Sequence, residues 1–241
     1  FWFYLEHSHI RALVKPETEP PCSRLYIPDK KSLLFQVSYY KERINFEVFH
    51  VLTDGTGATE FLKELVSNYL YLAHQKEGLE PVSMLPEDMT VQDQESDSFL
   101  KYYSKDQKRP KEKKTRAFQI RRKKKDGNHL HVHESVVSVK EVLKRSRELG
   151  VSMTVFLTAV FLKAIHEEMS KMQEKKPIVL MVPVNLRKFF PSTSMLNFFN
   201  WIEPGYDFSK WDRSFEEVLG YTKDFFEEQL TKEKMSAHIN D

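Results

Sequence analysis

The chain has 241 residues, of which 40% are hydrophobic and 30% charged, and its formal net charge at pH 7 is +2. This composition excludes a chain that is disordered throughout, and the nearly neutral charge does not require a polyanionic partner. The single cysteine, Cys22, excludes an internal disulfide and fits a reducing compartment. No apolar stretch is long enough to cross a bilayer and no signal peptide is visible, so we expect a soluble cytoplasmic protein.

Two neighbouring strands are predicted before residue 50. Side chains alternate from Leu33 to Tyr40 and again from Ile44 to Val48, with a polar turn between the two runs. Alternation with a period of two is typical of strands with one buried face, so a hairpin is expected. Apolar residues then recur at helical spacing over residues 56–73, which predicts an amphipathic helix.

The connection between this hairpin and the helix contains the pattern His-x-x-x-Asp-Gly, formed by His50, Asp54 and Gly55. If the strand runs to its end, His50 shares the buried face of Ile44 and Val48. Burial would keep the imidazole uncharged near neutral pH and able to accept a proton. Gly55 suits a backbone position that requires a positive φ or the close approach of a ligand.

Two groups of alternating histidines are candidate metal ligands: His7 with His9, and His129 with His131 and His133. Zinc requires three or four ligands, and neighbouring positions on one strand face lie about 6.6 Å apart, which is too far for one ion. We therefore expect polar strand faces and no metal.

Residues 108–116 and 121–125 are the most basic part of the chain. Such runs can bind nucleic acid, but the aromatic side chains on which bases stack are missing, apart from Phe118. A solvated crossover between two lobes is the favoured interpretation. A third is that these cations attract the phosphates of coenzyme A or an acidic carrier protein.

Helices and a strand are predicted in the second half of the chain. A capping box at Ser138 opens a helix that Gly150 closes, and a second helix over residues 153–172 is expected to be buried nearly all round at its start. Residues 178–182 are expected to form a central strand with both faces buried. Another capping box opens a helix at Ser214.

The His50 motif and a second stretch, Pro183 to Arg187, together resemble the chloramphenicol acetyltransferase and condensation-domain superfamily. Within it, the closest likeness is to bacterial alcohol-acetyltransferase-like proteins. The resemblance implies an α/β fold with a mixed sheet and two lobes, of which this chain covers the middle and is truncated at both ends. The expected organisation is an N-terminal lobe over residues 1–107, a basic crossover over 108–126 and a C-terminal lobe over 127–241.

The resemblance also implies an acyltransferase in which His50 is the general base. It would take a proton from an alcohol or amine as that group attacks a thioester carbonyl, and Gly55 would leave room at the turn. The family often has a second histidine just before this one, whereas this chain has Phe49. That difference favours the acetyltransferase side of the superfamily over the condensation-type side.

Further site residues are carried over from the resemblance. Arg187 matches an arginine that pairs with the motif aspartate, here Asp54, and this pair would hold His50 at one angle. Asn197 or Asn200, in a stretch that resembles the strand lining the channel between lobes, is expected to donate a hydrogen bond near the acyl group. The co-substrate would be acyl-CoA or an acyl-carrier thioester, with no bound cofactor and no membrane partner.

Two alternatives to this enzyme remain open. One is a binding module that uses the basic runs on nucleic acid or on a carrier protein. The other is a relative that keeps the fold without turnover, in which case His50 would lie sealed under side chains rather than open to substrate.

Overall fold

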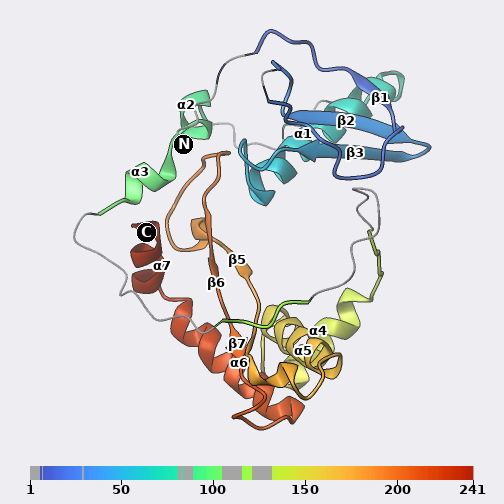
Figure 1. Ribbon diagram of the computed structural model, residues 1–241. Coiled ribbons are helices and arrows are strands. Elements are labelled where there is room, and N and C mark those ends of the chain that lie inside the picture. Colours follow the sequence, from blue (N-terminus) through green and yellow to red (C-terminus); the bar gives the residue numbers. More distant parts are fainter. Residues whose placement is uncertain are drawn as a thin grey trace. The chain divides into compact units, whose positions relative to one another are not determined.

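The computed structural model of the chain describes residues 6, 8–28, 30–80, 83, 89–104, 116–120 and 132–240 (Figure 1). The chain divides into two compact units. The first comprises Phe1–Lys101, Asn128–Val132 and Pro191–Phe198. The second comprises Tyr102–Gly127, His133–Phe190 and Phe199–Asp241. The basic runs at 108–115 and 121–125, together with His7, His129 and His131, lie outside the described residues.

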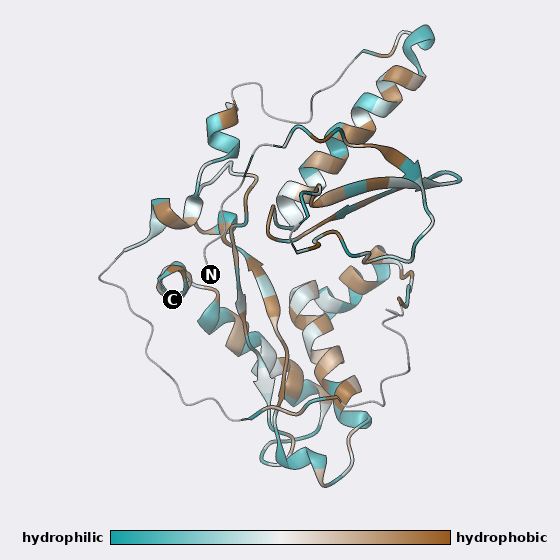
Figure 2. Cartoon of the chain, turned by 45° about the horizontal axis from the view of Figure 1, so that its top comes forward, coloured by the Kyte–Doolittle hydropathy of each residue, from teal (hydrophilic) through white to brown (hydrophobic). Residues whose placement is uncertain are grey.

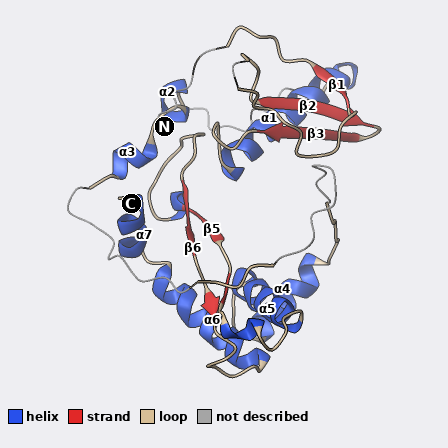
Figure 3. Ribbon diagram, in the orientation of Figure 1, coloured by secondary structure: helices blue, strands red, loops and turns tan. Residues whose placement is uncertain are grey.

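The first unit is built on a three-stranded sheet. β2 (Phe35–Tyr40) and β3 (Arg43–Val48) form the predicted antiparallel hairpin, and β1 (Val14–Pro16) runs parallel to β2 on its other side (Figure 3). In the register of β2 and β3, Val37 lies opposite Phe46, so apolar side chains of both strands share one face.

The long helix α1 (Gly55–Ala73) packs on this sheet through aromatic side chains. The ring of Phe61 lies 4.8 Å from that of Phe46 and 5.8 Å from that of Phe35, measured between centroids. Hydrophobic and hydrophilic stretches alternate along α1 in Figure 2, as expected for a helix with one covered face. Three short elements complete the helical part of the first half: η1 (Gln75–Glu77), α2 (Val91–Gln94) and α3 (Ser98–Tyr102).

The second unit combines a thin β ribbon with helices. β5 (Val182–Asn185) pairs with β6 (Phe199–Ile202), and β4 (Ile178–Val179) pairs with β7 (Gly205–Tyr206), both antiparallel. The prediction of a single strand with two buried faces is wrong here. Ile178 is buried, but Val179 and Met181 are exposed because each of these four strands pairs with a single neighbour among the described residues.

The helices of the second unit begin where serine side chains cap them. Ser138, Ser152 and Ser214 accept hydrogen bonds from the first turns of α4 (Val139–Glu148), α5 (Met153–Glu167) and α6 (Phe215–Gln229). Gly150, at φ 66°, follows the end of α4 as predicted. The sequence patterns do not predict the last helix, α7 (Lys232–Ile239). The second unit also contains two short helical turns, η2 (Gln173–Lys175) and η3 (Leu186–Lys188).

Helix α5 is shorter and less covered than predicted. It ends at Glu167, and its buried side chains lie on one face that packs against α6. Leu157, Val160 and Phe161 are exposed. Within the described residues no single helix is long and apolar enough to cross a membrane, and only the pair α4 and α5 passes that test, across a bend of 89°.

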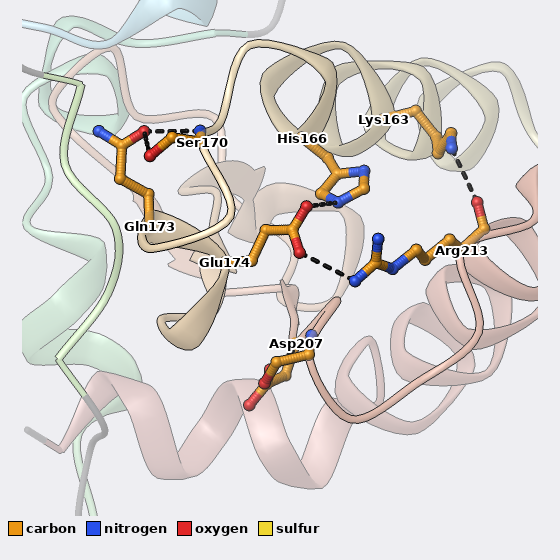
Figure 4. Close-up of polar contacts among 8 residues, drawn as sticks. Lys163, His166, Ser170, Gln173, Glu174, Asp207 and Arg213 are labelled. Carbon is orange, nitrogen blue, oxygen red and sulfur yellow. Dashed lines mark hydrogen bonds and ion pairs between the residues drawn. The ribbon is translucent and has the colours of Figure 1, made fainter.

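A largely buried carboxylate fixes the loop that precedes α6. One oxygen of Glu174 lies 3.2 Å from Nε2 of His166, and the other accepts a hydrogen bond of 2.8 Å from Nη2 of Arg213 (Figure 4). The His166 ring also stacks on Phe208, with centroids 3.9 Å apart. Glu174 therefore joins the end of α5 to the loop that enters α6.

Replacing Glu174 by glutamine should lower the free energy of unfolding by about 1–2 kcal/mol, because the neutral amide weakens both contacts. The measurement is the midpoint of urea unfolding, with the dependence of the unfolding free energy on urea concentration expected to stay the same. Glu227→Gln, at an exposed position on α6, is the matched control and should leave the midpoint in place. Equal midpoints for the two variants would contradict the bridging role of Glu174.

Candidate functional site

The motif histidine lies in a turn rather than on a strand. β3 ends at Val48, the turn covers His50 to Leu52, and Asp54 then begins the helix. His50 is exposed, so the prediction that it shares a buried strand face is wrong. The physical reason is the early end of β3: pairing with β2 stops at the Phe35–Val48 pair, and the chain bends before reaching the histidine.

Asp54 is the buried centre of the site. It is 5% exposed and caps α1, with Oδ1 accepting hydrogen bonds of 3.0 Å from the Thr56 N–H and 3.2 Å from the Gly57 N–H. The other oxygen, Oδ2, accepts one of 2.8 Å from the backbone N–H of Phe198. One carboxylate therefore joins the start of α1 to a segment 144 residues later in the chain.

That later segment, Pro191–Phe198, makes three more hydrogen bonds with residues 50–53. The hydroxyl of Thr53 donates a hydrogen bond of 2.5 Å to the carbonyl oxygen of Met195. The amide of Asn197 donates to the carbonyl oxygens of His50 at 2.8 Å and Val51 at 3.3 Å. The backbone of His50 is thus held by a segment that lies far from it in the sequence.

These contacts change the expected role of Asn197. Its amide nitrogen is directed at the backbone of the His50 turn, which makes it a positioning residue in this structure. Its Oδ1 atom is buried and has no hydrogen-bond partner among the described residues. The predicted hydrogen bond from Asn197 to an acyl group stays a prediction.

Asn200 has a structural contact in the second unit. It is 9% exposed, and its amide donates a hydrogen bond of 3.0 Å to the carbonyl oxygen of His238 on α7, while its Oδ1 accepts one of 2.8 Å from the Trp201 N–H. This side chain anchors α7 to β6. Its predicted role near the acyl group stays a prediction as well.

Arg187 lies in η3, just after β5, where its backbone N–H donates a hydrogen bond of 3.0 Å to Oδ1 of Asn185. Arg187 belongs to the second unit and Asp54 to the first. The ion pair between them therefore stays a prediction. Within the described residues, no group of three histidine, cysteine or acidic side chains could hold a metal ion.

The glycine that allows the close approach of the segment Pro191–Phe198 is Gly57 rather than Gly55. Gly55 has a negative φ as the first residue of α1, and a Cβ placed there would meet no atom within 4 Å. A Cβ at Gly57 would overlap both the hydroxyl oxygen of Thr53 and the carbonyl oxygen of Met195. The sequence could not show this, because one of the two neighbours, Met195, is 138 positions away by residue number.

Asp54→Asn should lower the free energy of unfolding by about 1–3 kcal/mol. Both oxygens of Asp54 accept backbone hydrogen bonds, so the NH₂ group of an asparagine at position 54 would face a backbone N–H and leave that donor without an acceptor. Thermal and urea unfolding measure this loss. Asp97→Asn is the matched control, since Asp97 is an exposed residue whose Oδ1 accepts a hydrogen bond from the Leu100 N–H at the start of α3, and asparagine caps helices about as well. A tolerated Asp54→Asn change would contradict the central role of this carboxylate.

Gly57→Ala should destabilise the chain by about 1–3 kcal/mol through overpacking against Thr53 and Met195. Gly55→Ala should be neutral or slightly stabilising, because alanine favours the helix and its methyl group enters open space. The two variants are compared by their urea midpoints. The reverse order of stability would show that the close approach lies at Gly55.

Comparison with known proteins finds a matching family model. The profile of the family described as Alcohol acetyltransferase matches residues 80–227. No curated protein matches the chain. The matched region contains Arg187, Asn197 and Asn200, whereas His50, Asp54 and Gly55 lie before it, so the match and the geometry of the turn are separate observations.

The matched residues make up more than half of the chain. The family is one of acetyltransferases, enzymes that use an acyl donor and a small-molecule alcohol as acceptor. This chain belongs to the alcohol acetyltransferase family.

Proposed function

We propose that this protein transfers an acetyl group from a coenzyme A thioester to an alcohol, with His50 as the general base. Membership of the alcohol acetyltransferase family supports the class of reaction. The observation that carries the choice of His50 is the turn itself. It displays an exposed imidazole on a backbone that Asp54 and Asn197 hold from two sides.

In this reaction the unprotonated imidazole accepts the hydroxyl proton while the alcohol oxygen attacks the thioester carbonyl. The carbon–sulfur bond then breaks, and the imidazolium returns the proton to the leaving thiolate. An ester and a free thiol result, without an acyl-enzyme intermediate. This route needs a base at a fixed position rather than a serine or cysteine nucleophile.

Exposure of His50 changes how the base would be controlled. The sequence pattern predicts burial that keeps the imidazole uncharged, and this structure does not show that burial. Orientation takes its place: a base gains most when its position relative to the reacting atoms is fixed before substrate arrives. An exposed histidine is also accessible to substrate, which argues against a relative of this fold with a sealed site.

The finer points of the proposal extend the family assignment. They are a two-lobed fold of the chloramphenicol acetyltransferase type, a brace between Asp54 and Arg187, and coenzyme A rather than a carrier protein as donor. An amine as acceptor is a variant of the same chemistry. The alternative of a nucleic-acid-binding module stays a prediction, because its basic runs lie almost wholly outside the described residues.

His50→Ala should lower kcat by about 10²–10⁴-fold, the usual contribution of a general acid–base group, with little change in the KM of acetyl-CoA. The assay follows thiol release from acetyl-CoA with a panel of alcohols. His74→Ala, which removes a half-exposed histidine at the end of α1, is the control and should retain activity. Unchanged thiol release by a folded His50→Ala variant would rule out His50 as the base.

A further inference from the structure

A pocket lies beside the His50 turn within the first unit. Its volume is about 800 Å³, within the range of about 300–1,000 Å³ that is common for small-molecule sites. Its wall is formed near the N-terminus by residues 6 and 8–10, then by residues 26 and 30–35, which lead into β2, and by Leu52 of the turn. Apolar side chains, including Ile10 and Leu33, share this wall with charged ones.

Three contacts connect the wall of this pocket to the turn. Leu52, two residues after His50, lines the pocket. The Phe49 N–H donates a hydrogen bond of 2.7 Å to the carbonyl oxygen of Leu34, another wall residue. The ring of Tyr26, also in the wall, stacks on Phe49 with centroids 5.9 Å apart and an interplanar angle of 9°. A ligand in the pocket would therefore contact the same residues that support the backbone of His50.

The lysine and glutamate charges in the described part of the wall do not cancel. Lys31 forms an exposed ion pair of 3.3 Å with Glu6, and both side chains line the pocket. Lys30 lines it too, and its ammonium has no ion-pair partner among the described residues. Among the residues that the structure describes, the wall thus carries one lysine without an ion-pair partner beside a surface that is mostly apolar by area. This arrangement suits a ligand with one negative charge on an apolar body.

We propose that this pocket binds the acceptor alcohol, and that the acceptor carries an anionic group, a carboxylate or phosphate, which pairs with Lys30. The inference rests on the proposed function, because it makes the pocket a subsite of the His50 turn. Coenzyme A is a poorer fit, since its phosphate and diphosphate groups call for several cations rather than one. The apolar body would lie on Leu33 and Leu52, with the hydroxyl group directed at the turn.

The test compares two acceptors of matched length with acetyl-CoA as donor: ω-hydroxyoctanoate, which is anionic, and n-octanol, which is neutral. Lys30→Gln should raise the Michaelis constant for ω-hydroxyoctanoate by about three- to tenfold, because one charge contact is lost. The Michaelis constants for n-octanol and acetyl-CoA should not change. Lys31→Gln should have a smaller effect, because Glu6 already neutralises that lysine, and Lys15→Gln, on exposed β1 outside the pocket, should have none.

A binding measurement separates this inference from the proposed function. Calorimetry with ω-hydroxyoctanoate and the His50→Ala variant needs no turnover, and adding Lys30→Gln should raise the dissociation constant by the same factor. Leu33→Trp, which fills the pocket, should weaken both alcohols alike. A dissociation constant for ω-hydroxyoctanoate that is unaffected by Lys30→Gln would overturn the proposal, as would a weakening of acetyl-CoA alone. Retained acetyl transfer by His50→Ala, with intact binding of ω-hydroxyoctanoate, would instead count against His50 as base and leave this inference standing.

Discussion

The structure around the motif depends on one buried carboxylate. Asp54 accepts three backbone hydrogen bonds, two from the first turn of α1 and one from Phe198, so it is both a helix cap and a tie between distant parts of the chain. A carboxylate that is 5% exposed and satisfied by backbone donors holds a loop well, because leaving any of those donors without a partner is costly.

Hydrogen bonds of Thr53 and Asn197 reinforce the connection that Asp54 makes. Thr53 brings the Met195 carbonyl against Gly57, and the absence of a side chain at Gly57 is what lets the two backbones approach. Asn197 then reaches the carbonyl oxygen of His50 itself. The segment Pro191–Phe198 therefore acts on the turn as a partner strand would, although it forms no ladder with β3. Its role is to position the histidine backbone.

Elements decided by neighbouring residues could be predicted from the sequence. The β2–β3 hairpin, the start of α1 and the helices capped by Ser138, Ser152 and Ser214 all follow from short-range patterns, and the structure confirms them. Features decided by distant residues could not. Alternation alone extends the strand as far as His50, whereas its pairing ends at Val48. The motif points to Gly55, whereas Met195 makes Gly57 the constrained position.

His50, the proposed general base, is exposed, and that places a particular demand on the protein. A buried histidine can be tuned by its surroundings, but one on an open turn can be improved mainly by limiting where its ring can travel. The contacts in this structure hold the backbone on both sides of His50, from which the ring extends. Leu34 fixes the N–H of Phe49 before it, and Asn197 fixes the carbonyl groups of His50 and Val51. The wall of the neighbouring pocket includes Leu34 and Leu52, so the surface proposed to receive the acceptor is part of the scaffold that holds the His50 turn.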